Sequence, residues 1–300
     1  MPRLLWWVVS TAAVAGLAQH WRPLRPVNVR QTGAFRAPPL AESSGAVRSR
    51  AHPGRFWSIN DSENPATLFL ADTTGRVAGF VRIPGIANTD WEAVSAGPCG
   101  RGWCVFIGDI GDNREIRRTV TIFRLPEPTP GQLRATAVPR PESLVVRYPD
   151  GPRDAEALVV TGSGGLGIVT KGRNRPPRVY WVGPDAWGKG VVVAEFLTEL
   201  PIATSLLLGH LVTDAALSPD DEVMAVRTYK NLFFFRRSAG ARLPTRPEGV
   251  CPIGGLDPQG EGLAWWAPAT WLMTSEVTRF AAGAITLLEC RGPEPSPSGG

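Results

Sequence analysis

The sequence predicts an all-β fold, a five-bladed β-propeller, with six blades as the alternative. The first observation is a repeat, because five times a short acidic or hydroxyl-bearing cluster leads directly into a small apolar strand. The second is spacing: from Ser44 to Glu261 the clusters lie 48, 64, 59 and 46 residues apart, and a four-stranded blade takes about 40 to 50 residues. The third is punctuation, since the β-branched and aromatic runs between clusters end in Gly, Pro and Asp turns.

Each cluster is predicted to open the innermost strand of one blade. The clusters are Glu42-Ser43-Ser44-Gly45-Ala46, Asp90-Trp91-Glu92-Ala93-Val94, Asp154-Ala155-Glu156-Ala157-Leu158, Thr213-Asp214-Ala215-Ala216-Leu217 and Gln259-Gly260-Glu261-Gly262-Leu263. The inner strands of a propeller run in the same direction around one axis, so their first residues meet at one mouth of a central channel. The sequence therefore predicts a ring of oxygen-bearing side chains at that mouth.

Further blade strands can be read between the clusters. They are Trp103–Ile110, Thr119–Leu125 and Ser143–Tyr148 after Glu92, and Leu166–Lys171, Arg178–Val182 and Val191–Phe196 after Glu156. The second strand of a blade runs antiparallel to the first and so ends at the channel mouth. The residues expected there are Asn60, Asp61, Asp109, Lys171, Arg227, Tyr229 and Glu276.

The ring is expected to close through the N-terminal segment. The residues around Pro26 to Gln31 are predicted to pair with the strand Ala284 to Cys290 of the last blade, because that pairing removes an exposed sheet edge. The chain then divides into a signal peptide or N-terminal anchor (1–18), a lead-in with the closing strand (19–40), the propeller (41–290) and a disordered tail (291–300).

The N-terminal residues indicate export. Leu4 to Ala18 is apolar, and Gly16-Leu17-Ala18 fits a signal-peptidase site. A membrane span needs about 20 apolar residues, so a secreted or extracytoplasmic protein is expected, with membrane attachment through an uncleaved segment as the alternative. The tail from Arg291 is rich in Pro, Ser and Gly and too polar to bury.

Four cysteines in an exported chain favour two disulfides. Cys99 and Cys104 flank a predicted hairpin turn, while Cys251 precedes the last inner strand and Cys290 ends the last readable strand of the same blade. We predict the pairs Cys99–Cys104 and Cys251–Cys290. A zinc site is disfavoured, since the cysteines do not form paired C-x-x-C units and the three histidines are scattered.

The composition argues against several function classes. The net charge is +5, but no dense basic stripe with interleaved aromatics is present, so nucleic acid is not expected as a partner. Gly162 to Gly167 fits G-x-G-x-x-G, yet a strand follows where a dinucleotide site needs a helix. There is no G-x-S-x-G serine hydrolase motif.

We expect a monomer whose partner is a small anionic ligand or an extracellular protein.

Carboxylates crowded at one mouth repel one another unless a cation lies among them. We expect Glu92, Glu156 and Glu261 to converge on a single hard cation, with Ser44 beside them. Oxygen-only ligands favour Ca²⁺ over zinc. The glycine-rich segment Gly108 to Asn113 adds two carboxylates and an amide near Glu92, as a loop that contacts the metal or a ligand.

These motifs resemble a group of secreted bacterial β-propeller proteins over about residues 40 to 280. The resemblance rests on Asn60-Asp61, Asp90-Trp91-Glu92, Gly108-Asp109-Ile110-Gly111-Asp112-Asn113, Tyr148-Pro149-Asp150-Gly151, Asp154-Ala155-Glu156-Ala157-Leu158, Ser218-Pro219-Asp220, Arg227-Thr228-Tyr229 and Gln259-Gly260-Glu261. The ring is also similar to the calcium site of the five-bladed apyrases, where each blade gives one oxygen ligand. More distantly it resembles the calcium-dependent propeller phytases, which hold phosphate with carboxylates, calcium and Lys or Arg.

The chain departs from the secreted group in the fourth blade. An acidic residue is expected close to position 216, where this chain has Ala216. Alternate strand residues face the same way, so Asp214 lies in a similar direction one pleat higher. Asp214 is therefore the expected fourth ligand, with the Thr213 hydroxyl or a water molecule as the alternative.

Two function classes remain open. In the first, the metal ties the blades together and the polar mouth binds a ligand or a protein. In the second, the protein is a calcium-dependent hydrolase of phosphate esters or anhydrides. Its catalytic residues would be Lys171 or Arg227 on the phosphoryl oxygens and Asp109, Asp112 or Glu276 on the attacking water. Hydrolysis needs these outer residues to converge near the ion, whereas a structural ion needs only the innermost ring. We therefore favour the binding module.

Overall fold

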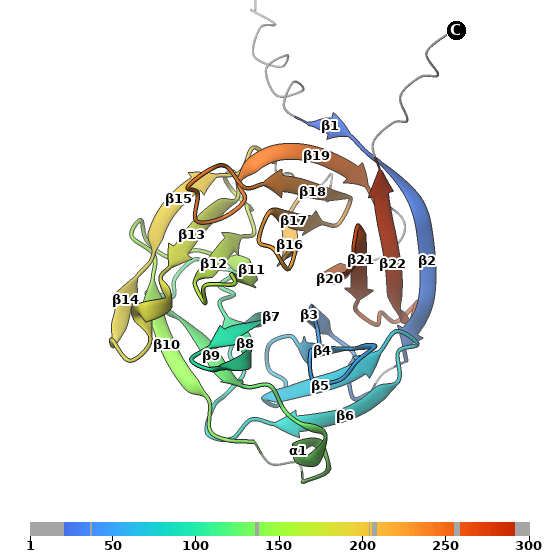
Figure 1. Ribbon diagram of the computed structural model, residues 1–300, viewed down its shortest axis with the longest axis vertical. Coiled ribbons are helices and arrows are strands. Elements are labelled where there is room, and N and C mark those ends of the chain that lie inside the picture. Colours follow the sequence, from blue (N-terminus) through green and yellow to red (C-terminus); the bar gives the residue numbers. More distant parts are fainter. Residues whose placement is uncertain are drawn as a thin grey trace, which may run out of the picture.

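The computed structural model describes residues 21–36, 38–135, 138–203, 205, 209–254 and 259–291. These residues form five β-sheets around a central axis, and each sheet presents one edge strand to the centre (Figure 1). The predicted five-bladed β-propeller is confirmed, and the six-bladed alternative is not adopted. The predicted leader over residues 1–18 and the predicted tail beyond Arg291 lie outside the described residues.

Four antiparallel strands, counted from the axis outward, make up each blade, and blades two and four gain a short parallel strand at the outer edge. Blade one contains β3 (Ser43–Arg48), β4 (Arg55–Asn60), β5 (Thr67–Asp72) and β6 (Val77–Arg82). Blade two contains β7 (Trp91–Cys99), β8 (Gly102–Asp109), β9 (Val120–Pro126), β10 (Glu142–Arg147) and the parallel β14 (Val191–Val193). Blade three contains β11 (Ala155–Val160), β12 (Leu166–Thr170), β13 (Arg178–Val182) and β15 (Glu195–Glu199).

The last two blades take up the N-terminal strands. Blade four contains β16 (Val212–Leu217), β17 (Val223–Thr228), β18 (Asn231–Arg236), β19 (Arg246–Pro252) and the parallel β1 (Arg22–Pro23). Blade five contains β20 (Gly260–Ala267), β21 (Thr270–Ser275), β22 (Gly283–Arg291) and β2 (Arg25–Phe35). Helical structure in the described residues is limited to α1 (Pro130–Ala135) and a 3₁₀ turn, Pro184–Ala186. No helix among them is long and apolar enough to cross a membrane.

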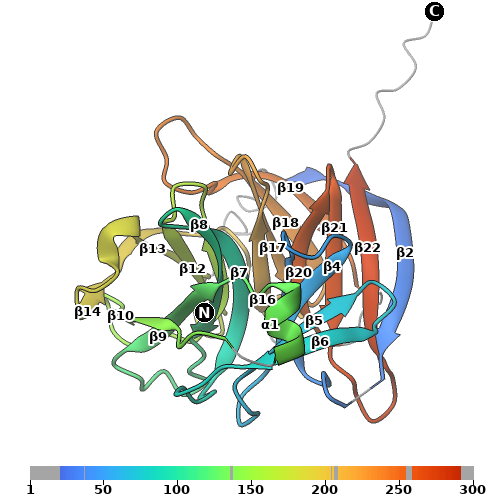
Figure 2. The ribbon, with the colours of Figure 1, turned by 60° about the horizontal axis from the view of Figure 1, so that its bottom comes forward.

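The N-terminal segment closes the ring as predicted. Strand β2 pairs antiparallel with β22, from Pro26 opposite Cys290 to Phe35 opposite Gly283, and it forms the outer edge of blade five in both views (Figure 1, Figure 2). The pairing extends to Phe35, beyond the predicted Gln31. Because β1 has already paired with β19, the same segment joins the outer edges of blades four and five.

One predicted strand is wrong as a single element. The run Val191–Phe196 divides at Ala194, which is buried. Its first part is β14, which pairs with β10 of blade two, and its second part belongs to β15, which pairs with β13 of blade three. The chain therefore crosses between two blades in the middle of a run that contains no turn residue.

The core consists of five apolar clusters, one between each pair of adjacent blades. Successive residues of a strand point to opposite faces of its sheet. In β4, for example, Trp57 and Ile59 pack against blade two, whereas Phe56 packs against blade five. Every blade is thus buried on both faces, and the hydrophobic gain is distributed around the whole ring.

Both predicted disulfides are confirmed. Cys99–Cys104 spans the β7–β8 hairpin with a Cα separation of 5.8 Å. Cys251–Cys290 joins β19 of blade four to β22 of blade five with a Cα separation of 6.2 Å. Its two ends therefore lie in neighbouring blades rather than in one. Two disulfides are consistent with an oxidising, extracellular environment.

Candidate functional site

All five inner strands carry a β-bulge at the same level, near their first residue. In β7, for instance, Trp91 pairs with Asp109 and Ala93 with Gly108, so Glu92 is left unpaired. A bulge adds one residue to one strand and redirects its side chain. The bulged residues of the five blades are Ser44, Glu92, Glu156, Thr213 and Glu261. The predicted ring of oxygen-bearing residues thus has a structural basis in four of its five positions.

The ring position in blade four differs from the expectation. The register of β16 leaves Thr213 unpaired and pairs Asp214 with Arg227, so Thr213 stands at the ring level. The Asp214 carboxylate accepts hydrogen bonds from the backbone amides of Ala215 at 2.8 Å and Leu263 at 2.7 Å. It therefore ties blade four to blade five. The Thr213 hydroxyl is buried and has no hydrogen-bond partner in the described part of the chain.

Three carboxylates gather between blades one and two. One oxygen each of Asp61, Asp90 and Glu92 lies within 4.8 Å of the other two, and Ser44 Oγ donates to Glu92 Oε2 at 3.0 Å. Ligand atoms about 2.3 to 2.6 Å from a calcium ion can lie that far apart. Among the described residues no other trio of Asp, Glu, His or Cys meets this distance, so Glu92, Glu156 and Glu261 are not brought together to the same extent.

Burial and like charge destabilise the ionised form of this cluster. Burial, with the charges of Glu156 and Asp61, raises the pKa of Glu92 well above its usual value. Burial, with the charges of Asp61 and Asp154, raises the pKa of Asp90 to about 6. The cluster is therefore a place where a cation would be stabilised strongly.

Lys171 already supplies a positive charge to another part of the mouth. Its Nζ lies 2.6 Å from Glu156 Oε1, and the two side chains are 13% and 1% exposed. Burial disfavours the ammonium form, but the carboxylates of Glu156, Asp154 and Glu92 together raise the pKa of Lys171. The expected position of Lys171 at the mouth is observed, and its ammonium group is bound to a ring carboxylate.

Blades four and five contribute the remaining acidic side chains. Tyr229 donates its hydroxyl to Glu261 Oε1 at 2.9 Å. Glu276 follows β21 at the mouth, and burial, with the charges of Glu261 and Asp61, raises its pKa to about 7. Glu276 thus lies in the electrostatic field of the ring, as its strand-end position predicts.

The glycine-rich loop after β8 is held by an arginine. Arg117 Nη2 lies 2.6 Å from Asp109 Oδ1, and Arg117 donates its backbone amide to Asp112 Oδ2 at 2.7 Å. Asp112 donates its own amide to Asp154 Oδ1 at 3.0 Å. Asp109 and Asp112 are buried, and these two proposed catalytic carboxylates bind Arg117 within the loop, while the Asp154 carboxylate ties the loop to blade three. Gly111 lets the loop approach the acidic cluster, because a Cβ there would lie 2.6 Å from the Asp90 carboxyl carbon.

Arg227 lies between blades four and five. It is 1% exposed, and its Nη1 donates to the carbonyls of Gly262 at 2.6 Å and Thr274 at 2.8 Å. Gly260 makes room for it, since a Cβ at that position would lie 1.8 Å from Arg227 Nη2. Its position near the mouth agrees with the expectation, but its Nη1 is bound to the backbone.

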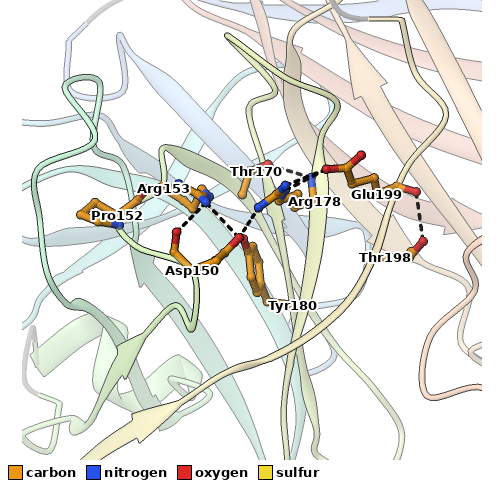
Figure 3. Close-up of polar contacts among 8 residues, drawn as sticks. All are labelled: Asp150, Pro152, Arg153, Thr170, Arg178, Tyr180, Thr198 and Glu199. Carbon is orange, nitrogen blue, oxygen red and sulfur yellow. Dashed lines mark hydrogen bonds and ion pairs between the residues drawn. The ribbon is translucent and has the colours of Figure 1, made fainter.

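A polar cluster on the outer part of the mouth face fixes the connection from β10 to β11, which leads to Glu156 (Figure 3). Asp150 accepts hydrogen bonds from Tyr180 at 2.8 Å and from Arg153 at 2.9 Å. Arg178 contacts the same carboxylate and also pairs with Glu199 at 2.8 Å. The cluster joins blade two to blade three. Asp150 of the Tyr148-Pro149-Asp150-Gly151 motif therefore has a structural role.

Sequence reasoning placed Asp61 and Asp90 near the mouth but not among the metal ligands. The signal was available for Asp90, which lies two residues before Glu92 in the second cluster. Arg117 was missed, since nothing in its spacing shows that the loop folds back onto Asp109.

Comparison with known proteins gives no sequence match and two distant structural likenesses. No family model matches the chain, and no curated protein matches its sequence. A solved structure of the PQQ-bound aldose sugar dehydrogenase from Streptomyces coelicolor is similar with a TM-score of 0.47 and 10% identity, over 88% of this chain and 98% of that one. The structure of a putative gluconolactonase is similar with a TM-score of 0.46 and 12% identity, over 89% and 94%. At this distance the likeness gives no information on activity.

Proposed function

We propose that this protein is an exported, non-catalytic β-propeller that holds a hard divalent cation at the mouth of its channel and binds a ligand or protein there. The observation that carries the proposal is the cluster of Asp61, Asp90 and Glu92, whose oxygens lie within 4.8 Å of one another. Such a cluster costs free energy when all its members are ionised, and a cation removes that cost.

The ligand chemistry favours Ca²⁺. The candidate ligands are carboxylate and hydroxyl oxygens, and calcium accepts six to eight of them in flexible geometry. Ser44 adds a hydroxyl at 3.0 Å from Glu92. Lys171 neutralises the charge of Glu156. An external ion is therefore expected beside Glu92 and not at the centre of the five ring residues.

The contacts that the outer residues already make favour a binding module over a hydrolase. Asp109 and Asp112 are bound to Arg117, and Arg227 Nη1 donates to two backbone carbonyls. A phosphoryl group would have to compete with these buried contacts. Export is supported by the two disulfides, the apolar N-terminal residues and the resemblance to secreted bacterial propellers.

The test is the melting temperature of chelator-treated protein as calcium is restored. At a hundredfold excess over Kd a bound ion stabilises by about 2.7 kcal/mol, or roughly 5 to 10 °C for a protein of this size. We expect Asp90→Asn and Glu92→Gln to lose this response, while Glu63→Gln, an exposed carboxylate at the β4–β5 turn, keeps it. Without calcium, Asp90→Asn should be at least as stable as wild type, because it removes a repelling charge. No calcium response in wild type would overturn the proposal.

A phosphate-release assay separates the two function classes. With calcium present, we expect no turnover of nucleotides, sugar phosphates or p-nitrophenyl phosphate. Turnover that is lost in both Glu92→Gln and Lys171→Ala would contradict the binding module and favour the hydrolase.

A further inference from the structure

A cavity lies at the end of the propeller axis opposite the carboxylates. The axis is surrounded by the inner strands β3, β7, β11, β16 and β20 (Figure 1). Their bulged first residues lie at the acidic mouth, so the strands finish at the opposite end. Their last residues line a cavity of about 440 Å³. Small-molecule sites usually measure about 300 to 1,000 Å³.

The wall of this cavity is apolar. Its lining includes small or aliphatic side chains, among them Ala46, Val94, Ala96, Val160, Ala215 and Leu263. Because alanines recur at this level, the five strands approach one another without filling the space between them. Such a wall attracts an apolar body and offers no charge to balance a buried ion.

The opening of the cavity is positively charged. Arg48 and Arg50 both line it and are exposed. The Arg48 guanidinium lies 5.6 Å from the ring centre of Trp265 and 5.7 Å from that of Trp266, and the Arg50 guanidinium lies 4.9 Å from the ring centre of Trp103. Stacking on aromatic rings restricts a guanidinium group while leaving its N–H donors available at the edge.

The loop that carries Arg50 is fixed from the neighbouring blade. Glu127, which follows β9 and is 8% exposed, accepts hydrogen bonds from Ser49 Oγ at 2.6 Å, the Arg50 amide at 3.0 Å and the Ala51 amide at 3.2 Å. Trp57 Nε1 donates to the same carboxylate at 2.8 Å. A loop ordered before binding loses less entropy when a ligand arrives.

The opposing charge at the cavity is small. Among the described residues that line it, Asp221 alone has a carboxylate. Asp221 Oδ2 accepts the Gly162 amide at 2.7 Å and lies 3.6 Å from Arg237 Nη2. Among the lining side chains the two rim arginines therefore outnumber the one acid, and the Glu127 carboxylate behind the loop is bound to Ser49, Trp57 and two backbone amides.

We infer that this cavity binds a small amphipathic organic anion, with an apolar body in the channel and a single carboxylate at Arg48 and Arg50. The apolar wall selects the body, and the arginines select the charge and orient the carboxylate through N–H donors. This site shares no residue with the acidic cluster at the other end of the channel. Its occupation does not depend on the proposed cation.

The test is calorimetric titration with three molecules of the same shape. These are 2-naphthoate, neutral 2-naphthylmethanol and cationic 2-naphthylmethylammonium. We expect 2-naphthoate to bind about tenfold or more tightly than the alcohol, and the ammonium to bind most weakly. In the double variant Arg48→Gln, Arg50→Gln the preference for 2-naphthoate should disappear while the affinity for the alcohol is kept. Arg175→Gln, an exposed arginine on the acidic face, is the matched control and should bind like wild type.

A second variant tests the location independently. Ala96→Leu, which fills the cavity, should weaken all three probes by about tenfold or more while the melting temperature stays within a few degrees of wild type. The inference is overturned if wild type does not bind 2-naphthoate at millimolar concentration, or binds anion and alcohol equally. A preference that survives the double arginine change also overturns it. If that double variant unfolds, Arg50→Gln alone and Ala96→Leu decide between the same outcomes.

Discussion

The carboxylates of the acidic mouth are balanced in different ways at the scale of single residues. Glu156 has the ammonium group of Lys171 at 2.6 Å, and Glu261 has the Tyr229 hydroxyl at 2.9 Å. Glu92 instead has Ser44 and two further carboxylates close by. A hydroxyl group stabilises a carboxylate less than a full positive charge does. The need for an external cation is therefore greatest beside Glu92.

Gly111 is a sensitive position because it lies directly against the acidic cluster. An added Cβ would meet the Asp90 carboxyl carbon at 2.6 Å and the Glu92 Cγ at 2.8 Å. We expect Gly111→Ala to lower the free energy of unfolding by about 1 to 3 kcal/mol and to remove the calcium response. Gly102→Ala in the same blade is the control, since the nearest atom to its Cβ is 3.8 Å away. Urea unfolding measures both, and equal stabilities would show that the loop is not packed as described.

Thr213 and Asp214 should respond in opposite ways to isosteric changes. The Thr213 hydroxyl is buried with no partner among the described residues, so Thr213→Val in calcium-free buffer should change stability by less than about 0.5 kcal/mol or increase it. Asp214 accepts the amides of Ala215 and Leu263, so Asp214→Asn, which replaces one acceptor with a donor, should cost about 1 to 3 kcal/mol. Denaturant unfolding of both variants checks the bulge register. A costly Thr213→Val beside a neutral Asp214→Asn would contradict it.

The sequence predicted which residue types gather at the mouth but not their pairing. Ser44, Glu92, Glu156 and Glu261 could be found because each repeats at one point of a blade. Asp214 was chosen over Thr213 because an alternating pattern assumes an unbroken strand, and the bulge shifts the count by one residue. The partners of Asp109 and Asp112 depend on how a loop folds back, which no spacing encodes.

At the scale of elements, the connections between blades position the ring as much as the strands do. The segment from β10 to β11 carries Asp150 and Arg153 and ends at the first ring-bearing residues of blade three. Arg178 and Tyr180 of β13 bind Asp150 from the neighbouring blade (Figure 3). This polar cluster around Asp150 fixes the start of β11, and therefore the position of Glu156.

The polar cluster around Asp150 predicts that the stability of the protein depends on pH. Burial raises the pKa of Asp150, but the hydrogen bonds from Tyr180 and Arg153 outweigh burial, so its pKa lies below the ordinary value of 3.8. A carboxyl group whose pKa is lowered by folding adds stability that is complete above its unfolded pKa and is lost as the pH falls through its folded pKa. We therefore expect Asp150→Asn to be less stable than wild type by a constant margin from about pH 5 to 7. The margin should shrink below about pH 4. Urea unfolding at both ends of this range measures it, and a margin independent of pH would exclude this role of the charge.

The strands themselves could mostly be predicted from their composition. Arg178–Val182 has the predicted bounds, since a β-branched and aromatic run between turn residues has few alternatives. The run Val191–Phe196 misled because no Gly, Pro, Asn or Asp marks a turn within it, and the crossing at Ala194 is set by which neighbouring blade offers a free edge. That choice belongs to tertiary packing and leaves no local signal.

At the scale of the whole molecule, the ring works as a frame with two chemically different ends. Five apolar interfaces hold the blades, β2 joins the first part of the chain to the last blade, and the Cys251–Cys290 disulfide joins blade four to blade five. The blade number followed from the repeat, because five clusters can only open five inner strands. One end of the channel is acidic, and the other is apolar with an arginine rim. The cation site and the anion site that we propose therefore lie at opposite ends of one axis.

The central claim, that the acidic mouth holds a divalent cation, is tested most directly by titrating Ca²⁺ into chelator-treated protein and counting the ions bound. The account predicts one calcium ion per chain in wild type and in Glu63→Gln, and none in Glu92→Gln at the same concentrations, because Glu92 belongs both to the ring and to the carboxylate cluster. Absence of binding in wild type, or an unchanged stoichiometry and affinity in Glu92→Gln, would contradict it.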